Sequence, residues 1–226
     1  MRFILFILFG IFLSTSLSAQ FNIKVGYQYG LTKPTTHNKI IDQINTNNSS
    51  FDNYNKMKSI KSFHGANFGT RYRVGAVGLN LDWNPKFQII EFEGTNPTTD
   101  VSEFRKLYYR FDSYSLGVEF FIKQFSFGLS YDWNKMRVRS ENTERTDRHE
   151  IFNTKNTSSH FFVSLNVYGN ENLTIALQPY VQVPWTNFDF TNLENDLNTG
   201  VNLNDYEDGF MNYGIKLIFQ NGHYED

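Results

Sequence analysis

The sequence contains no cysteine. This absence excludes a disulfide-stabilised scaffold, an acylated lipoprotein and a metal site built on thiolates. Net charge is also small, since 21 lysines and arginines stand against 23 aspartates and glutamates. A slightly acidic chain lacks the electrostatic footprint of a nucleic-acid-binding protein. We therefore expect no nucleic-acid partner.

Long apolar runs are missing beyond the N-terminus. Residues 3–13 are almost wholly apolar, follow Arg2 and precede small residues that end at Ala19. The run is shorter than the about 20 residues of a membrane-spanning helix, but its layout is that of a secretory signal peptide. We predict that residues 1–19 are a signal peptide and that no later segment crosses a membrane as a helix.

The sequence has instead a repeated alternation of apolar and polar residues. In the segment 212–219, Tyr213, Ile215, Leu217 and Phe219 fall on one face. A period of two is typical of a β-strand with one apolar face. Similar segments predict eight strands, at 20–31, 62–74, 77–90, 106–122, 125–134, 161–167, 173–185 and 209–220.

The connections between these segments are alternately long and short. Long polar segments lie at 32–61, 94–105, 141–158 and 191–208. Outer-membrane barrels have long loops at one end and tight turns at the other. We predict an all-β fold, an eight-stranded antiparallel up-and-down transmembrane β-barrel of residues 20–220. A short periplasmic tail follows at 221–226, and the expected location is the cell outer membrane.

Glycines indicate which face of the strands points inward. All eight strand glycines considered share the polar face: Gly26, Gly30, Gly65, Gly69, Gly78, Gly117, Gly128 and Gly214. The interior of an eight-stranded barrel is only just wide enough for side chains. The small and polar face therefore points inward, and the bulky face meets lipid. A secreted lipocalin-like barrel, with its apolar face around an internal ligand, is the alternative.

Charged residues on the inward face must neutralise one another, because unpaired charge is costly in a narrow lumen. We predict a lumen charge network of Lys24, Arg71, Arg73, Asp82, Glu119, Asp132 and Lys216. A packed polar plug is the favoured interpretation, and a conducting pore is the alternative. On the outward face, Trp83, Trp133 and Trp185 lie near the long-loop ends of their strands. They predict an aromatic girdle at the membrane interface.

Two places disturb the alternation. Pro179 lies inside a predicted strand and cannot donate to the ladder, so we expect a bulge or irregular pairing there. The pattern also slips at Ile89 and Ile90, where we predict a second bulge.

The first and last long segments differ in charge. Segment 32–61 has five lysines and two aspartates, whereas 191–208 has five carboxylates and no lysine or arginine. Barrel closure makes these segments neighbours, so we predict that they dock on each other. Both are also predicted contact sites for an envelope protein partner. Residues 204–209 offer oxygen ligands for Ca²⁺ but lack EF-hand spacing, so we expect no metal and no cofactor.

A catalytic alternative rests on Ser159, His160 and Glu150, which are the residue types of a hydrolase triad. No spacing resembles the His-x-Ser-Asn pattern of lipid-A deacylase barrels. An exposed polar loop end is the favoured interpretation. We therefore predict no catalytic residues, and a lipid-modifying outer-membrane enzyme is the alternative.

The C-terminal pattern Asn212-x-Gly214-x-x-Leu217-x-Phe219 resembles the signal read by the barrel-assembly machinery. Together with the Ser-Ala-Gln ending of the signal peptide and the aromatic strands, it gives the chain a likeness to a family. Residues 20–220 resemble the small outer-membrane β-barrel proteins (OmpA/OmpX-like barrel domain) common in Bacteroidota. The resemblance implies a non-enzymatic barrel amid outer-membrane lipid and lipopolysaccharide. It also implies a structural or partner-binding role through extracellular loops, or membership of an envelope complex such as a secretion system.

Overall fold

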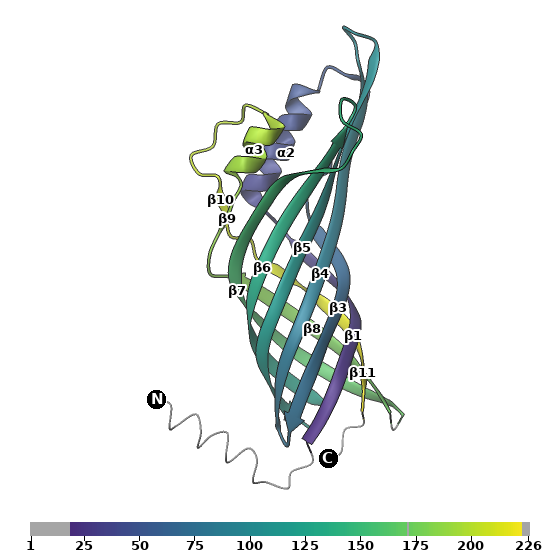
Figure 1. Ribbon diagram of the computed structural model, residues 1–226, viewed down its shortest axis with the longest axis vertical. Helices are drawn as coiled ribbons and strands as arrows, with labels where there is room; N and C mark the ends of the chain where they lie inside the picture. The colour runs from purple at the N-terminus through teal and green to yellow at the C-terminus, as the bar shows by residue number, and fades with distance from the viewer. Residues whose placement is uncertain (1–18, 171, 223–226) are drawn as a thin grey trace.

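The computed structural model describes residues 19–170 and 172–222. Residues 1–18 of the predicted signal peptide and 223–226 of the predicted tail lie outside the described residues. Eight antiparallel strands close into a ring (Figure 1). In chain order they are β1 (Ala19–Thr32), β3 (Ser62–Val74), β4 (Val77–Asn96), β5 (Val101–Ile122), β6 (Phe125–Asn142), β7 (His149–Asn170), β8 (Leu173–Pro184) and β11 (Asn212–Asn221).

The ring closes where the first strand meets the last. β1 pairs with β11 from Lys24 opposite Gln220 to Thr32 opposite Asn212. All other neighbours in the ring are consecutive barrel strands. The predicted eight-stranded up-and-down barrel is therefore confirmed.

A belt of large apolar side chains surrounds the ring. On β11, Tyr213, Ile215, Leu217 and Phe219 are between 40% and 51% exposed, and the other barrel strands carry similar outward side chains. An apolar surface of this extent marks contact with another apolar phase. A closed barrel can enter a bilayer because each backbone group is paired within the ring. The chain is a transmembrane β-barrel of the outer-membrane type, and the lipocalin-like alternative is wrong because the apolar face points outward.

Beyond the belt, the apolar face of several strands passes from the outside to the inside. Along β5 the buried inward residues change from Glu119 and Ser113 to Phe111 and Leu107. The outward positions change from lipid-facing side chains to charged ones such as Arg110. The strand continues without a break while its surroundings change from membrane to water.

This exchange of apolar and polar faces explains why the alternation of apolar and polar residues breaks at Ile89 and Ile90. β4 pairs with β5 over its whole length without a shift in register. Ile89 is 56% exposed on the outward face, whereas Ile90 is buried inside. The predicted bulge is wrong, because the change lies in the surroundings of the strand and not in its backbone.

The strands also extend farther than predicted. β4, β5 and β6 rise well beyond β8 and β11 in Figure 1, and segments 94–105 and 141–158, predicted as loops, are largely strand. Their outward positions are polar because they face water. The prediction of loops was wrong because polarity was taken as a sign of irregular structure.

A cap fills the space inside these projecting strands. It consists of α2 (Thr35–Asn47), α3 (Thr191–Leu197), and the two-stranded sheet of β9 (Phe188–Asp189) and β10 (Glu207–Asp208). A short strand, β2 (Asp52–Asn55), pairs with the extension of β4. Among the described residues, no helix is long and apolar enough to cross a membrane.

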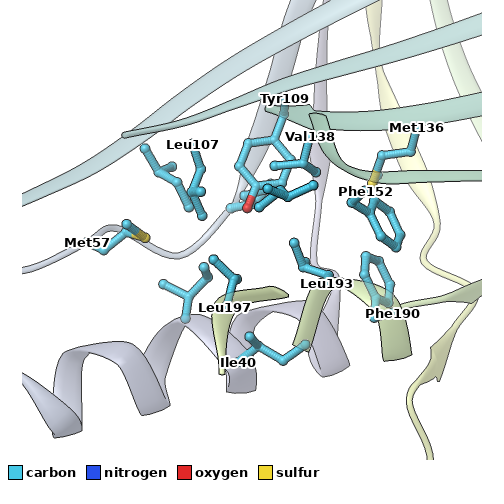
Figure 2. Packing of buried hydrophobic residues seen from close by; sticks show 14 of the residues in the cluster. Ile40, Met57, Leu107, Tyr109, Met136, Val138, Phe152, Phe190, Leu193 and Leu197 are labelled. Atoms are coloured by element: carbon cyan, nitrogen blue, oxygen red, sulfur yellow. The ribbon is translucent and has the colours of Figure 1, made fainter. Parts of the chain in front are cut away.

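The cap packs on the projecting strands through a continuous apolar core (Figure 2). Ile40 of α2 and Leu193 of α3 are fully buried opposite Leu107 and Val138 of the barrel strands. Phe190 stacks on the Phe152 ring at 5.2 Å with an interplanar angle of 7°. The molecule thus has a polar interior within the belt and an apolar interior above it.

Pro179 interrupts the pairing of β7 with β8. Two residue pairs are missing beside it, but the register is the same on both sides of the gap. The Nε2 of Gln178 donates to Ser164 Oγ at 2.8 Å between the two strands. The expected irregular pairing is present, and the expected bulge is not.

Pro85 produces the same arrangement between β3 and β4. Two pairs are missing beside it, again without a change of register. The Nδ2 of Asn67 donates to Asn84 Oδ1 at 2.7 Å. In both gaps an inward amide side chain joins strands that the backbone leaves unjoined.

We predict that Leu193→Ala loosens the cap and leaves the barrel closed. Removing this fully buried side chain costs about 2–5 kcal/mol through lost burial and a residual cavity. Hydrogen exchange of the α2 and α3 amides should accelerate, while heat-modifiable migration on a gel stays as in the wild type. Met211→Ala, at a position 50% exposed, is the control and should change neither. Slow exchange in Leu193→Ala would contradict the proposed role of this core.

Candidate functional site: the barrel lumen and its cap

The lumen near the tight turns holds a first cluster of predicted charges. Lys24 Nζ lies 2.7 Å from Asp82 and donates to Asn80 Oδ1 at 2.8 Å. Asn80 Nδ2 donates to Glu119 Oε2 at 3.0 Å, and Ser126 Oγ donates to the other oxygen of that carboxylate at 2.6 Å. All of these side chains point into the barrel, and each carboxylate has a cation or a donor beside it.

Two arginines complete this cluster. Arg71 donates to Asn22 Oδ1 from two nitrogens and lies 3.8 Å from Glu119. Arg73 donates to the carbonyl oxygen of Gly75 at 2.7 Å. Both guanidinium groups lie over the ring of Phe121, at 4.8 and 4.2 Å from its centre. Five of the seven predicted network residues are therefore brought together at the turn end.

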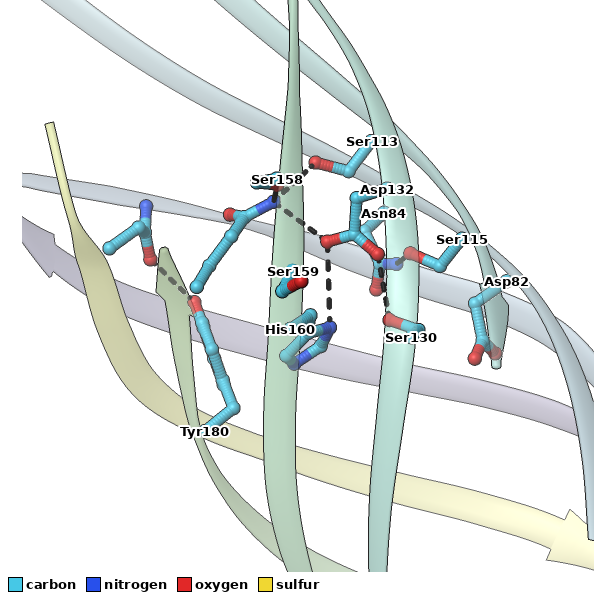
Figure 3. A network of polar contacts seen from close by, with 12 residues as sticks. Asp82, Asn84, Ser113, Ser115, Ser130, Asp132, Ser158, Ser159, His160 and Tyr180 are labelled. Carbon is cyan, nitrogen blue, oxygen red and sulfur yellow. Dashed lines mark hydrogen bonds and ion pairs between the residues drawn. The ribbon is translucent and has the colours of Figure 1, made fainter. Parts of the chain in front are cut away.

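A second cluster gathers around Asp132, with Ser130, Ser158 and His160 near it (Figure 3). Gln182 Nε2 lies 2.8 Å from Asp132 Oδ2 and 3.0 Å from Ser158 Oγ. Ser130 Oγ donates to Asp132 at 2.7 Å, and His160 Nδ1 lies 3.7 Å from the same carboxylate. Asp132 thus has its own set of hydrogen-bond partners, distinct from those of Asp82 and Glu119.

Two buried lysines flank this second cluster. Lys86 Nζ donates to Gln182 Oε1 at 3.2 Å, and Lys216 Nζ donates to Asn84 Oδ1 at 3.1 Å. Each ammonium lies 5.3 Å from the centre of the Tyr180 ring. In the part of the chain that the structure describes, neither lysine is within ion-pair distance of a carboxylate. Sequence reasoning missed Lys86 and His160 as members, although the parity of their strands points both inward.

The space between these side chains is closed. The hollow bounded by Gln28, Lys86, His160 and Lys216 does not admit a water molecule. The lumen at this level is packed with hydrogen-bonded side chains, so the geometry favours a plug over a pore.

The catalytic alternative is not assembled. His160 points into the lumen toward Asp132, whereas Ser159, as its neighbour on the strand, points outward and accepts a hydrogen bond from Trp185 Nε1 at 2.8 Å. Glu150 lies ten residues along β7 and bonds Asn153. Adjacent residues of a strand face opposite sides, so Ser159 and His160 cannot act as a nucleophile and its base.

The three tryptophans lie on one line around the barrel. Trp83 pairs in register with Tyr114, and Tyr114 with Trp133. The line continues to Trp185, whose backbone nitrogen donates to Thr157 O at 2.8 Å. All three rings are outward, at the level where the apolar belt gives way to charged side chains. Their role as an interfacial girdle stays a prediction.

The predicted assembly-signal residues lie on both faces of the closing strand. Leu217 and Phe219 point outward, whereas Asn212 is buried and accepts a hydrogen bond from Tyr180 OH at 2.9 Å. At Gly214 a side chain would meet the backbone oxygen of Tyr29 on β1. Glycine at this position lets β11 pair closely with β1. Recognition of this strand by the assembly machinery stays a prediction.

The first and last long segments meet in the cap, as the docking prediction expected. Asp208 accepts a hydrogen bond from the backbone N–H of Thr36 at 2.7 Å, in the first turn of α2. At the other end of this helix, Asn47 Nδ2 donates to Thr199 O at 2.8 Å. Among the described residues no ion pair joins the two segments. A helix cap and an apolar core, rather than lysine–carboxylate pairs, hold them together.

A buried histidine also joins the cap to the barrel wall. His37 of α2 places Nε2 2.7 Å from the hydroxyl of Tyr109 on β5, and both side chains are almost fully buried. Burial lowers the pKa of His37 from its ordinary 6.5 to about 4, against a smaller opposing effect of Asn38. His37 is therefore neutral in the docked cap at neutral pH.

The oxygen-rich segment at 204–209 belongs to the cap. Glu207 and Asp208 form β10, and Asp208 is engaged with α2. Within residues 19–170 and 172–222, no three histidine, aspartate or glutamate side chains gather as metal ligands would.

No protein-family model matches the chain, and no curated protein matches it. Among solved structures, similarity is found to Ail, the attachment invasion locus protein of Yersinia pestis, in complex with the heparin analogue sucrose octasulfate. The TM-score is 0.49 and the identity 11%, over 91% of this chain and 99% of that chain. Neisserial surface protein A gives a TM-score of 0.47 at 7% identity, over 91% and 99%. OprG from Pseudomonas aeruginosa gives 0.40 at 8%, over 90% and 96%. These identities are too low to match any residue of those proteins to one of this chain.

We predict that Lys24→Met destabilises the barrel by roughly 3–5 kcal/mol, because it leaves the Asp82 carboxylate without its cation in the lumen. The double variant Lys24→Met/Asp82→Asn should recover most of the loss. Urea unfolding from lipid vesicles, followed by tryptophan fluorescence, measures both. Equal stability of the single variant and the wild type would show that the pair does not contribute.

We predict that the cap undocks more readily as the pH falls from about 6.5 to about 4. Over this range the undocked His37 takes up a proton that the docked one does not, so docking loses roughly 3 kcal/mol and then levels off. Hydrogen exchange of the α2 amides at several pH values measures the effect.

His37→Gln is the matched control, because it removes the titrating group from the α2 position. Burial raises the pKa of Asp208, so that carboxyl stabilises the docked state as it becomes protonated and opposes His37. The difference between wild type and His37→Gln isolates the histidine. The same pH dependence in both proteins would contradict the prediction.

Proposed function

We propose that the chain is a non-enzymatic outer-membrane barrel with a closed lumen, which holds a folded cap at the cell surface as a docking platform. A signal peptide at 1–19 would export it, and the assembly machinery would read residues 212–219. The platform would bind an envelope protein or a ligand, and membership of an envelope complex such as a secretion system fits this role.

One observation carries the proposal: the cap has an apolar core of its own, continuous with the projecting strands. Short connections suffice to close a barrel, and long segments with their own structure are usually functional. A core that includes fully buried Ile40 and Leu193 holds the cap surface in one shape. A rigid surface loses little conformational entropy on binding, which favours recognition.

The exposed charges of the cap suggest the chemistry of the partner. Asp196, Asp205 and Glu207 are exposed on segment 191–208, which contains no cation. Glu194 of the same segment is buried and accepts hydrogen bonds from Thr199 Oγ1 and the Gly200 N–H. Asp205 and Glu207 each accept one hydrogen bond within the cap but remain exposed to solvent, as does Asp196. A basic protein surface complements these three carboxylates.

The absence of cysteine allows a clean test with single-cysteine variants. Asp196→Cys on the cap should react with a membrane-impermeant maleimide on intact cells. Gln124→Cys, at an exposed turn of the opposite end, should react only after the outer membrane is permeabilised. The reverse pattern would show that the cap faces the periplasm and would overturn display at the surface.

The same variants test docking. With a cleavable photo-cross-linker attached, Asp196→Cys should form one defined adduct in native outer membranes, and Gln124→Cys should not. No adduct at Asp196, or the same adducts at both positions, would contradict the docking role and leave the surface display standing.

A further inference from the structure

Two adjoining hollows lie beyond the apolar belt. The first lies on the outer face of β5 and β6, and the second lies between β4 and the segment after β2. They measure about 380 and 460 Å³ and share Ile89, Tyr108 and Arg148. We call them together the basic groove. The cap packs against the inner face of these projecting strands (Figure 1), so the first hollow lies on the side that the cap does not cover.

Cations dominate the lining of the basic groove. The first hollow is lined by Arg110, Arg137, Arg139 and Arg148, with no carboxylate among its lining residues. The second adds Lys56, Lys58 and Lys106, and Glu91 is its one acidic residue. Basic side chains from β5 and β6, from the segment after β2 and from the segment between β6 and β7 therefore converge on one surface.

The protein neutralises only part of this charge. Asp112 binds Arg110 at 2.8 Å and Arg137 at 3.0 Å. Glu141 lies 3.5 Å from Arg148, and Glu91 lies 3.1 Å from Lys106.

Three cations of the groove have no such partner. Among the described residues, no carboxylate is within ion-pair distance of Arg139, Lys56 or Lys58. The groove thus keeps a surplus of positive charge, which a bound anion would balance.

An apolar hollow lies next to the basic groove on the membrane side. It measures about 640 Å³ and its lining includes Phe68, Leu81, Trp83 and Leu116 of the belt. Trp83 of the apolar hollow and Phe87 of the basic groove are four residues, or about 13 Å, apart along β4. The guanidinium of Arg110 lies between them, 6.0 Å from the Trp83 ring and 5.9 Å from the Phe87 ring.

We propose that the basic groove binds the phosphate of a lipid headgroup in the leaflet at the cap end, with an acyl chain of that lipid in the apolar hollow. The planar fork of an arginine matches phosphate oxygens, and several arginines on one face favour a head with net negative phosphate charge over a zwitterionic one. The apolar hollow favours a membrane lipid over a soluble anion. The proposal rests on the membrane-spanning fold and not on the docking role of the cap, so the two can fail separately.

Native mass spectrometry tests the proposal. The full barrel is released from micelles that contain equal amounts of phosphatidylcholine and bisphosphorylated lipid A, and the retained lipid is identified. The wild type should retain lipid A. Arg139→Gln/Arg148→Gln should retain roughly fivefold less, the size expected for two exposed charge contacts.

The matched control is Lys135→Gln/Lys155→Gln. These lysines pair in register between β6 and β7 and line neither hollow, so the retention of lipid A should stay as in the wild type. Heat-modifiable migration shows that both double variants are folded.

Three results would overturn the proposal. An equal loss of lipid A in both double variants would show a diffuse attraction rather than a groove. Equal retention of dephosphorylated lipid A would show that phosphate is not recognised. Displacement of lipid A by inorganic phosphate at an equal concentration would show a site for a soluble anion that makes no use of the apolar hollow.

Discussion

The constraint on which this structure depends is that each long strand passes through two different solvents. The side chains of a strand alternate between inside and outside at every step. Within the membrane the outside must be apolar, and above it the outside must be polar. The inward side chains are the other half of this alternation. They are polar within the membrane and apolar above it. β5 shows this when its buried face changes from Glu119 and Ser113 to Phe111 and Leu107.

The two interiors that result are stabilised by different physics. Within the belt the lumen holds charges, and each additional charge must find a partner or pay a desolvation cost. Lys24, Asp82 and Glu119 satisfy this through direct contacts. Above the belt the cap core is stabilised by burial of apolar area, with Phe190 against Phe152 as an example. The basic groove lies outside this second interior, at the level where the outward face changes its solvent.

The barrel was predictable because period-2 alternation, glycine parity and loop lengths agree on one answer. The inward members of the network followed from the same parity. The sequence did not show how they divide into two clusters, because that depends on side-chain contacts across the lumen, such as the one from Lys86 on β4 to Gln182 on β8. His160 was misplaced because its strand was expected to begin near residue 161, whereas β7 begins at His149.

The cap could not be predicted from local pattern. α2 contains β-branched and polar residues, lacks a side-chain N-cap of its own and is capped by Asp208 from a distant segment. The basic groove was missed for a related reason. Lys56, Lys58 and Arg148 come from segments predicted as loops, and Arg137 and Arg139 lie beyond the predicted end of their strand at residue 134. Only the extension of β6 places these two arginines beside β5.

The hydrogen bond from Thr36 to Asp208 also links the cap to closure of the barrel. Its two residues are 172 positions apart in the chain, and closing so long a loop has a high entropic cost until the intervening strands are in place. Asp208 lies four residues before β11, and α2 begins three residues after β1, so pairing of Thr32 with Asn212 brings the two partners together. The N-terminus of α2 is therefore tied to the place where the barrel closes.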